Sequence, residues 1–301
     1  MNRTTHPLGG ALLALALLAG CSAGPGETKD SPPPQLEEQP EKTPVSESAT
    51  PEETDTLGQE SPGSEVEPNA AEPEPDVPGD PPLEIQYEMN DASYRFTPLS
   101  DEVDADAVLL TFDDGPKERA LLERMLAILD KHSAKAIFFV NGYRVEQQPE
   151  LLQLVSDNGH MIGNHAWDHI DLRKAEPQEA RRQIDEVQTI VSEVTGEAPR
   201  FFRPPFGSGG DAVKEMAAEQ GLLYMTWSNG SRDWENAARD NPEVVISSVM
   251  EQLHPGANIL MHELPWTADA LDELLGLLTA KGYSFIDPAT IKLPDRPAAA
   301  E

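Results

Sequence analysis

The sequence predicts an α/β fold with a parallel strand core in the C-terminal two thirds of the chain. Short apolar runs there alternate with longer segments in which apolar residues recur at helical spacing. Proline stands near the start of several of these segments and glycine just after their ends, as is typical of helix boundaries. Each connection between apolar runs is long enough to cross over a sheet, which parallel strands require.

The first twenty residues are predicted to be a signal peptide. A polar start with Arg3 precedes an apolar run from Leu8 to Gly20 that is too short to span a bilayer stably. The run leads into "LLAGCS", which resembles the lipobox of bacterial lipoproteins. Cys21 is the only cysteine, so we expect no disulfide within the chain. We expect Cys21 to be lipidated and to anchor the chain at the extracytoplasmic face of the cell membrane. The alternative is an ordinary secretory signal with an incidental cysteine.

Residues 21–83 are predicted to be a disordered tether. Stretches such as "SPPPQLEEQPEKTP" hold scarcely any aromatic or β-branched residue to bury. This composition cannot offset the entropy lost on ordering. After a lipidated cysteine, it predicts a linker that carries a folded domain away from the membrane.

The remaining chain divides into a lead-in at residues 84–102, a folded domain at 103–288 and a C-terminal tail at 289–301. Strands are predicted at 107–112, 134–140, 160–165, 199–205, 222–227, 257–262 and 283–287. Helices are predicted at 119–131, 149–158, 177–195, 210–220, 242–253 and 267–281. The alternation favours a parallel sheet, either doubly wound or curled into a small barrel.

The charge of the chain excludes some partners. The net charge is −32, and the stretch from Ser22 to Asn90 holds 18 acidic and 2 basic residues, so about half of the excess lies in the folded part. A domain this acidic is not expected to bind nucleic acid through its net field. Nothing in the sequence implies an oligomer.

Polar residues follow the predicted strands where each strand ends. The carboxyl ends of parallel strands lie on one face, where α/β folds build their sites. We therefore expect seven side chains to converge there. They are Asp113, Asp114, His165, His169, Arg203, Asp233 and His262.

The stretch "TFDDGP" places Asp113 and Asp114 at the mouth of a buried strand. Taken alone, Asp-Asp-Gly-Pro is ordinary turn chemistry. At a strand end, however, two adjacent carboxylates need a cation or a hydrogen-bond donor to stay ionised. One of them is suited to ligate a metal and the other to act as a base.

The stretch "HAWDH" places His165 and His169 four residues apart, a spacing that suits two nitrogens on one ion. The alternative is that backbone groups satisfy both imidazoles. A carboxylate from another strand end would complete three protein ligands with an open position, as in hydrolytic zinc sites.

The stretch "FRPPFG" presents Arg203 from a loop stiffened by two prolines. Arg203 is either a surface residue or an ion-pair partner that orients an aspartate. The fixed backbone could also direct the N–H of Phe206 at an oxyanion.

Two further stretches, "SRDW" and "ILMHE", carry Asp233, Trp234 and His262. By default Asp233 is a surface acid and Trp234 a packing aromatic. His262 at a strand end is suited to proton transfer near neutral pH if a carboxylate orients it.

Taken together, "TFDDG", "HAWDH", "FRPPFG", "SRDW" and "LMH" resemble, in this order, the five motifs of the polysaccharide deacetylase family, also called the NodB-homology domain or carbohydrate esterase family 4. The resemblance covers residues 103–288. It implies a distorted (β/α) barrel of seven or eight strands and metal-dependent hydrolysis of acetyl groups on a polysaccharide.

The resemblance also implies roles for individual residues. Asp113 would be the general base, positioned by Arg203, and His262 the general acid, tuned by Asp233. Asp114, His165 and His169 would bind a divalent metal, most often Zn²⁺, with Co²⁺, Ni²⁺ or Mn²⁺ possible. The backbone of Phe206 would help to hold the oxyanion, and Trp234 and Leu260 would line the acetyl pocket.

Three positions depart from the family pattern. Ala166 stands where serine or threonine is usual, so one hydrogen bond worth about 1 kcal/mol is lost and a looser histidine loop is expected. Gly230 stands where a further aspartate is common, which would alter the groove wall or the support of Arg203. Phe206 replaces the usual tyrosine, which should matter little for a backbone role.

We therefore expect an anchored deacetylase that acts on an N-acetylated glycan of the cell wall or the extracellular space, such as peptidoglycan, a chitin-like polymer or poly-N-acetylglucosamine. One alternative is an inactive lipoprotein that holds glycan in the same groove. Another is an O-acetyl esterase acting on a xylan-like polymer.

Overall fold

The computed structural model describes residues 83–295. The predicted signal peptide, Cys21 and the tether up to residue 82 lie outside the described residues, as do residues 296–301. No helix formed by residues 83–295 has the length and apolar character needed to cross a membrane.

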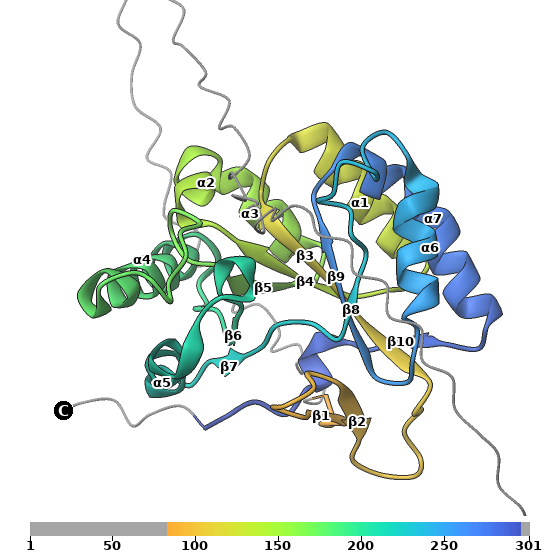
Figure 1. The fold of residues 1–301 in the computed structure, drawn as a ribbon, viewed down its shortest axis with the longest axis horizontal. Helices are drawn as coiled ribbons and strands as arrows, with labels where there is room; N and C mark the ends of the chain where they lie inside the picture. The colour runs from red at the N-terminus through yellow and green to blue at the C-terminus, as the bar shows by residue number, and fades with distance from the viewer. Residues whose placement is uncertain (1–82, 296–301) are drawn as a thin grey trace, which may run out of the picture. The chain divides into compact units, whose positions relative to one another are not determined.

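Eight strands form one parallel sheet that curves into an incomplete barrel (Figure 1). Its path runs β7–β6–β5–β4–β3–β9–β8, and β10 pairs with the start of β3. The strands are β3 (Ala107–Gly115), β4 (Ala136–Val140), β5 (Met161–Asn164), β6 (Phe201–Phe202), β7 (Leu223–Tyr224), β8 (Asn229–Gly230), β9 (Ala257–His262) and β10 (Ser284–Phe285). This architecture confirms the predicted barrel-like fold with a parallel core.

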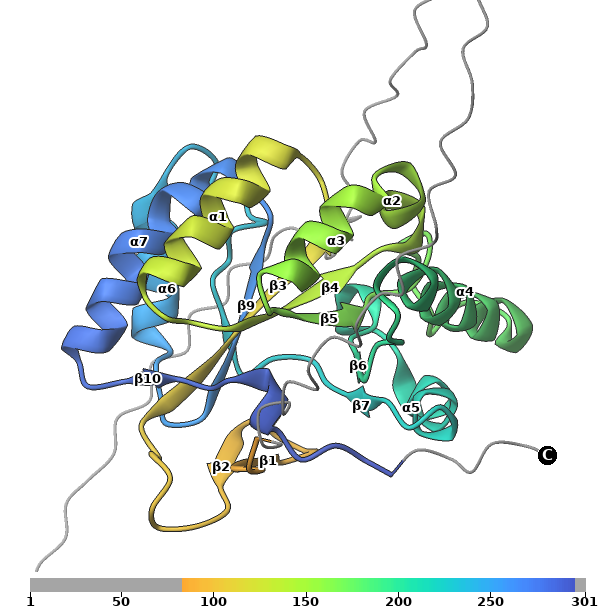
Figure 2. The same ribbon diagram turned by 180° about the vertical axis from the view of Figure 1, so that it is seen from behind.

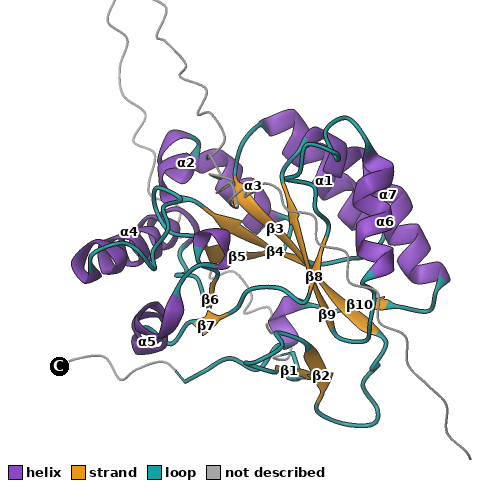
Figure 3. Ribbon diagram, viewed as in Figure 1, coloured by secondary structure: helices purple, strands orange, loops and turns teal. Residues whose placement is uncertain are grey.

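Helices cover the outer face of the sheet, with α1, α6 and α7 grouped at one side (Figure 2). Figure 3 shows how they alternate with the strands along the chain. They are α1 (Arg119–Lys131), α2 (Gly142–Gln147), α3 (Pro149–Asp157), α4 (Pro177–Thr195), α5 (Gly210–Glu219), α6 (Pro242–Glu251) and α7 (Pro265–Ala280), with 3-10 turns η1 (Pro205–Gly207) and η2 (Pro288–Thr290). The six helices predicted from the sequence are all present, with ends within two residues of the prediction.

The central strand β3 is buried on both faces and separates two apolar clusters. Val108, Leu110 and Phe112 pack against the helices, while Ala107 and Leu109 belong to the inner cluster. This alternation follows from the period of two along a strand. Asp113 continues the inward series, so its position in the strand directs it to the interior of the barrel.

Residues 84–102 do more than lead into the domain. They contain the antiparallel pair β1 (Tyr87–Met89) and β2 (Phe96–Pro98), whose apolar residues join the inner cluster. Phe96 N donates to Gly256 O at 2.9 Å, and Lys292 N donates to Tyr87 O at 2.8 Å. The folded unit therefore extends beyond residues 103–288 at both ends, because the inner face of the sheet needs this cover.

Besides β1 and β2, the short elements α2 and β8 were also not expected from the sequence. The helix α2 is less than two turns long, and only Gly142 and Val145 of its residues are buried. The strand β8 falls in "SNGSRDW", whose residues are typical of turns. It is a strand because Asn229 and Gly230 pair in parallel with Ile259 and Leu260 of β9, a contact far away in sequence.

Candidate active site

The carboxyl ends of the strands enclose a cavity of about 450 Å³. It opens at the edge where β3, β5 and β9 end, as expected for an α/β site. Eight of its lining residues come from the sequence prediction, whereas Gly207 and Trp227 do not. The lining comprises Asp113, Asp114, His165, His169, Phe206, Gly207, Trp227, Trp234, Leu260 and His262.

A β-bulge at the end of β3 turns two consecutive carboxylates into the same site. The register with β4 passes from Asp113↔Phe139 directly to Gly115↔Val140, so Asp114 is left out of the ladder. Asp114 has a left-handed backbone, with φ of 67°. Without the bulge, adjacent strand residues would point to opposite faces.

Arg203 and Asp113 form a buried ion pair. The guanidinium is fully buried, and its Nη1 donates to Asp113 Oδ1 at 2.6 Å and to Thr111 Oγ1 at 2.8 Å. Its Nη2 donates to Thr226 O and to Asn258 Oδ1, which leaves it fixed in the barrel interior. Burial lowers the pKa of Arg203, and the charge of Asp113 opposes this shift. Arg203 thus holds one oxygen of Asp113 and leaves Oδ2 for the cavity.

The two histidines of "HAWDH" face Asp114. The Nε2 atoms of His165 and His169 lie 3.4 and 3.1 Å from Asp114 Oδ1. His165 Nδ1 lies 2.7 Å from the carbonyl oxygen of Arg203. Because a carbonyl only accepts, Nδ1 of His165 carries the hydrogen and Nε2 has a lone pair available for a metal.

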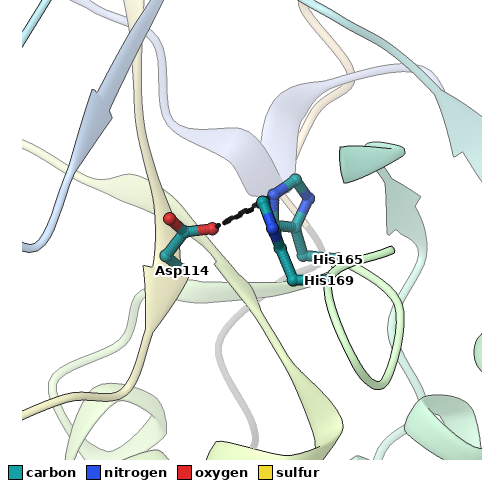
Figure 4. A group of neighbouring side chains, drawn as sticks. All are labelled: Asp114, His165 and His169. Atoms are coloured by element: carbon teal, nitrogen blue, oxygen red, sulfur yellow. Dashed lines mark ion pairs between the residues drawn. The ribbon is translucent and has the colours of Figure 1, made fainter. Parts of the chain in front are cut away.

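The residues present fit a divalent metal. Figure 4 shows the carboxylate of Asp114 directed at the two imidazoles. Asp114 Oδ1 is buried and accepts no hydrogen bond from the described residues, although one ligand atom of each of the three residues lies within 4.8 Å of the others. Burial raises the pKa of Asp114, but the two histidines outweigh it and hold the pKa well below its usual value. A carboxylate and two imidazoles form the donor set of open, hydrolytic zinc sites.

His262 and Asp233 form a second polar pair across the cavity. His262 Nδ1 lies 2.7 Å from Asp233 Oδ1, and the backbone N–H of His262 donates to Oδ2 at 2.7 Å. Thr267 Oγ1 also donates to Asp233 Oδ2. Burial lowers the pKa of His262, but the hydrogen bond and the charge of Asp233 outweigh it, so the pKa is raised above its usual value. The imidazole is therefore suited to carry a proton near neutral pH.

Aromatic side chains form the outer wall of the cavity. Phe206 and Trp234 are 65% and 47% exposed, which is unusual for such large apolar groups. Trp227 lies against Trp234 with ring centroids 6.3 Å apart. Trp227 was predicted to end a strand and was not expected to line the cavity. Its position at the end of an apolar run was the available signal.

The histidine loop is held by hydrogen bonds that do not require a hydroxyl at position 166. Ala166 is buried, with φ of 62°, and its N–H donates to Asn164 Oδ1 at 2.9 Å. Its carbonyl accepts from Gly142 N and from Asn141 Nδ2, each at 3.3 Å. Side-chain amides from β5 and the β4 end thus tie the loop, and no hydroxyl at position 166 is needed.

Gly230 affects the aromatic wall and has no part in holding Arg203. A Cβ at this position would lie 3.2 Å from Trp234 and 3.6 Å from Trp227 Nε1. A larger side chain would therefore press against both indoles. Every hydrogen-bond partner of the Arg203 side chain lies elsewhere, at Thr111, Asp113, Thr226 and Asn258.

Comparison with known proteins places this site in context. The sequence matches the family Polysaccharide deacetylase over residues 100–225. A peptidoglycan-N-acetylglucosamine deacetylase of Bacillus cereus is 34% identical over 184 residues, which cover 60% of this chain and 66% of that protein. The chain therefore spans just under two thirds of that relative's length. The peptidoglycan-N-acetylmuramic acid deacetylase PdaA of Bacillus subtilis is 30% identical over 211 residues, which cover 67% of this chain and 80% of that protein.

Solved structures share the fold. A pseudoenzyme of the CE4 family from Bacillus anthracis matches with a TM-score of 0.57 and 31% identity, over 60% of this chain and 63% of that chain. Since a pseudoenzyme has this fold, the fold alone does not establish activity. The family match and the extent of the similarity to PdaA do establish descent: this chain belongs to the polysaccharide deacetylase family.

Proposed function

We propose that this protein is a metal-dependent deacetylase that removes N-acetyl groups from a cell-wall glycan. The observation that carries the proposal is the arrangement around one cavity. A carboxylate held by arginine, an Asp-His-His metal site and a histidine held by a carboxylate all line the same space. This combination supplies a base, a Lewis-acid site and an acid, which amide hydrolysis requires.

The base is Asp113. Its Oδ1 is held by Arg203, while Oδ2 lies 3.7 Å from His165 Nε2, on the side of the metal ligands. A water molecule attacking at this point would give its proton to Oδ2. The ion pair with Arg203 keeps the carboxylate oriented for this transfer.

Asp114, His165 and His169 would hold a divalent metal, which would supply a Lewis acid for the acetyl carbonyl and for water. Phe206 lines the same cavity, and its backbone N–H would share the negative charge that develops on the carbonyl oxygen. Trp234 and Leu260 line the pocket and exclude water from the acetyl methyl group. Zn²⁺ is the metal that this donor set suits best, with Co²⁺, Ni²⁺ or Mn²⁺ as substitutes.

The acid is His262. Asp233 holds its Nδ1, so Nε2 is the atom that faces the cavity with a proton. Cleavage of the C–N bond needs a proton on the departing nitrogen, because an amide anion is a poor leaving group. Transfer from Nε2 provides this proton and completes the formation of a free amine and acetate.

The names of the relatives support peptidoglycan as the substrate. The Bacillus cereus relative is named for N-acetylglucosamine and the Bacillus subtilis relative for N-acetylmuramic acid, both in peptidoglycan. The exposed Phe206 and Trp234 at the cavity mouth offer flat apolar surfaces on which a sugar ring can stack.

Acetate release tests the proposal. We would assay the purified protein on peptidoglycan, chitin oligomers, poly-N-acetylglucosamine and acetylxylan, after chelation and again after adding Zn²⁺. Release from peptidoglycan that depends on added metal is expected. Release from acetylxylan alone would instead identify an O-acetyl esterase. If the metal-bound protein released acetate from none of these substrates, an inactive glycan-binding protein would be the better interpretation.

We further propose that Cys21 anchors the enzyme to the extracytoplasmic face of the membrane through a lipid. The lipobox-like "LLAGCS" and the acidic, proline-rich stretch after it support this location. Metabolic labelling with an alkyne fatty acid, followed by cell fractionation, tests it. Wild type should be labelled and sediment with membranes, whereas Cys21→Ala should be unlabelled; labelling of the variant would contradict the proposal.

A further inference from the structure

Glu263 follows the proposed acid directly but lies behind the cavity. It is 1% exposed and does not line the pocket. Its Oε1 is one of four buried side-chain polar atoms without a hydrogen-bond partner in residues 83–295. Burial raises the pKa of Glu263 to about 7, opposed by the N–H and charge of Lys117. Burying a carboxyl oxygen without a hydrogen-bond partner lowers the stability of the fold. The presence of such a group therefore calls for an explanation.

The side chain of Glu263 packs against the turn that follows the two catalytic-site aspartates. Its Oε2 accepts a hydrogen bond from Lys117 N at 3.1 Å. A Cβ built on Gly115 would lie 1.7 Å from Oε1 and 2.6 Å from Cδ of Glu263. All three of the atoms nearest to that Cβ belong to Glu263, so a residue larger than glycine at 115 would collide with the carboxyl group of Glu263.

The backbone of Glu263 joins the same parts of the site. Asp113 pairs with His262 in the β3–β9 ladder, and Glu263 N donates to Asp113 O at 3.5 Å, at the limit of a hydrogen bond. On the other side of the bulge, Asn141 N donates to Gly115 O at 3.0 Å. The bulge that turns Asp114 toward the histidines is therefore held between the end of β4 and the side chain of Glu263.

We infer that Glu263 is a positioning residue for the metal site and the base. Its carboxyl group fills the space under Gly115 and fixes Lys117 N, which keeps the bulge in the conformation that presents Asp113 and Asp114 to the cavity. Glu263 touches no reacting atom and acts only through the turn at 114–117. This inference deepens the proposed deacetylase function and rests on it for the consequence for turnover.

The first test compares two substitutions at position 263 in the full chain. Glu263→Ala removes both the acceptor for Lys117 N and the support under Gly115. We expect its zinc dissociation constant, measured by competition with a chromogenic chelator, to rise about tenfold, and kcat to fall by a similar factor. Glu263→Gln keeps the shape and one acceptor oxygen, and we expect it to recover most of the loss. Alanine and glutamine variants with equal zinc affinity would overturn the inference.

The second test uses the match between residues 115 and 263. Gly115→Ala alone should weaken zinc binding, because the added methyl group displaces the carboxyl group of Glu263. In Gly115→Ala/Glu263→Ala that collision is absent, so the double variant should bind zinc no more weakly than Glu263→Ala. Two effects that simply multiply would show that the positions act independently and would contradict the inference.

A matched control separates positioning from general loss of stability. Leu274→Ala removes a fully buried side chain on α7, away from the cavity. It should lower the melting temperature without changing zinc affinity, whereas Glu263→Ala should change both. Zinc affinity does not depend on the substrate. An inactive wild type would therefore contradict the proposed function, while wild-type zinc binding and turnover in Glu263→Ala would contradict the role of Glu263.

Discussion

At the scale of single residues, the site depends on two aspartates that are adjacent in sequence and have different surroundings. Asp113 faces the buried Arg203, whereas Asp114 faces His165 and His169. One carboxylate is thus held by a permanent cation and the other is available to a metal. Because the partners differ, substitutions at the two positions should have separable effects.

Asp113→Asn tests this separation. The amide keeps the size of the side chain but cannot accept the proton of water, so acetate release should fall by about 10²- to 10⁴-fold. Zinc affinity should stay within about threefold, since the three ligands are unchanged. Steady-state kinetics and chelator competition measure both quantities. A wild-type rate in this variant would show that Asp113 is not the base.

Asp233→Asn tests the control of His262. Asp233 raises the pKa of His262 against the effect of burial, so removal of its charge should lower that pKa. The protonated form of His262 would then be lost at lower pH, and the alkaline limb of kcat against pH should move to lower pH. If the alkaline limb of the pH profile of the variant stayed at its wild-type position, His262 would not be the group that titrates there. This conclusion would hold whatever the turnover rate of the variant.

Glu263 should make folding stability depend on pH. Its pKa is about 7 in the folded state against an ordinary 4.5, so between these values the folded protein binds more protons than the unfolded chain. Stability from this group is therefore greatest below pH 4.5 and is lost as pH rises through about 7. Urea denaturation of metal-free wild type and Glu263→Gln should show wild type losing on the order of 2 kcal/mol relative to the variant between pH 5 and pH 8. A constant difference would contradict the raised pKa.

At the scale of elements, the loop after β5 is positioned by buried amides. Asn164 Oδ1 accepts from Ala166 N, while Asn164 Nδ2 donates to Ile184 O on α4 and to Gln188 Oε1. This side chain therefore connects the histidine loop to a neighbouring helix. The hydroxyl that the family usually has at position 166 is not needed to complete these connections.

Asn164→Ala should therefore weaken the hydrogen bonding of the histidine loop more than Ala166→Ser, which adds a hydroxyl, changes it. Loss of three hydrogen bonds, two of them buried, should destabilise the protein by about 1–3 kcal/mol and weaken zinc binding, because His165 follows directly. Ala166→Ser is the matched comparison and should leave zinc affinity within about threefold. Thermal unfolding and chelator competition measure both. If Ala166→Ser changed stability or zinc affinity more than Asn164→Ala does, the side chain at position 166 would contribute more to the loop than Asn164.

At the scale of the whole molecule, the folded unit is completed by segments from both ends of the described chain. The sheet alone would expose the inner cluster around Leu109, Phe139 and Ile286. Tyr87, Met89 and Phe96 cover it from one end of the chain and Ile291 from the other. The site lies at the opposite, carboxyl end of the strands, so this cover supports stability and does not contact the cavity.

Phe96→Ala tests the contribution of this cover. Phe96 is 3% exposed, and its truncation should destabilise the protein by about 3–5 kcal/mol. Zinc affinity of the folded protein should be unchanged, because no residue of β2 lines the cavity. Urea denaturation and chelator competition are the measurements. A loss of stability below about 1 kcal/mol would show that β1 and β2 are not part of the cooperative unit.

The sequence by itself determined the α/β alternation, the six long helices and the seven side chains that meet at the strand ends, because apolar periodicity and strand-end position are local properties of a chain. Only the tertiary structure decided the bulge at Asp114, the strand β8, the amides that replace a hydroxyl at Ala166, and the contact of Glu263 with Gly115. The bulge, β8 and the contact of Glu263 depend on register or close approach between segments up to 148 residues apart, as in the bond from Thr111 to Ile259 that aligns β3 with β9, and the Ala166 loop depends in part on Asn141 at the end of the neighbouring strand. Such contacts are set by packing of the whole sheet, and no local pattern encodes them.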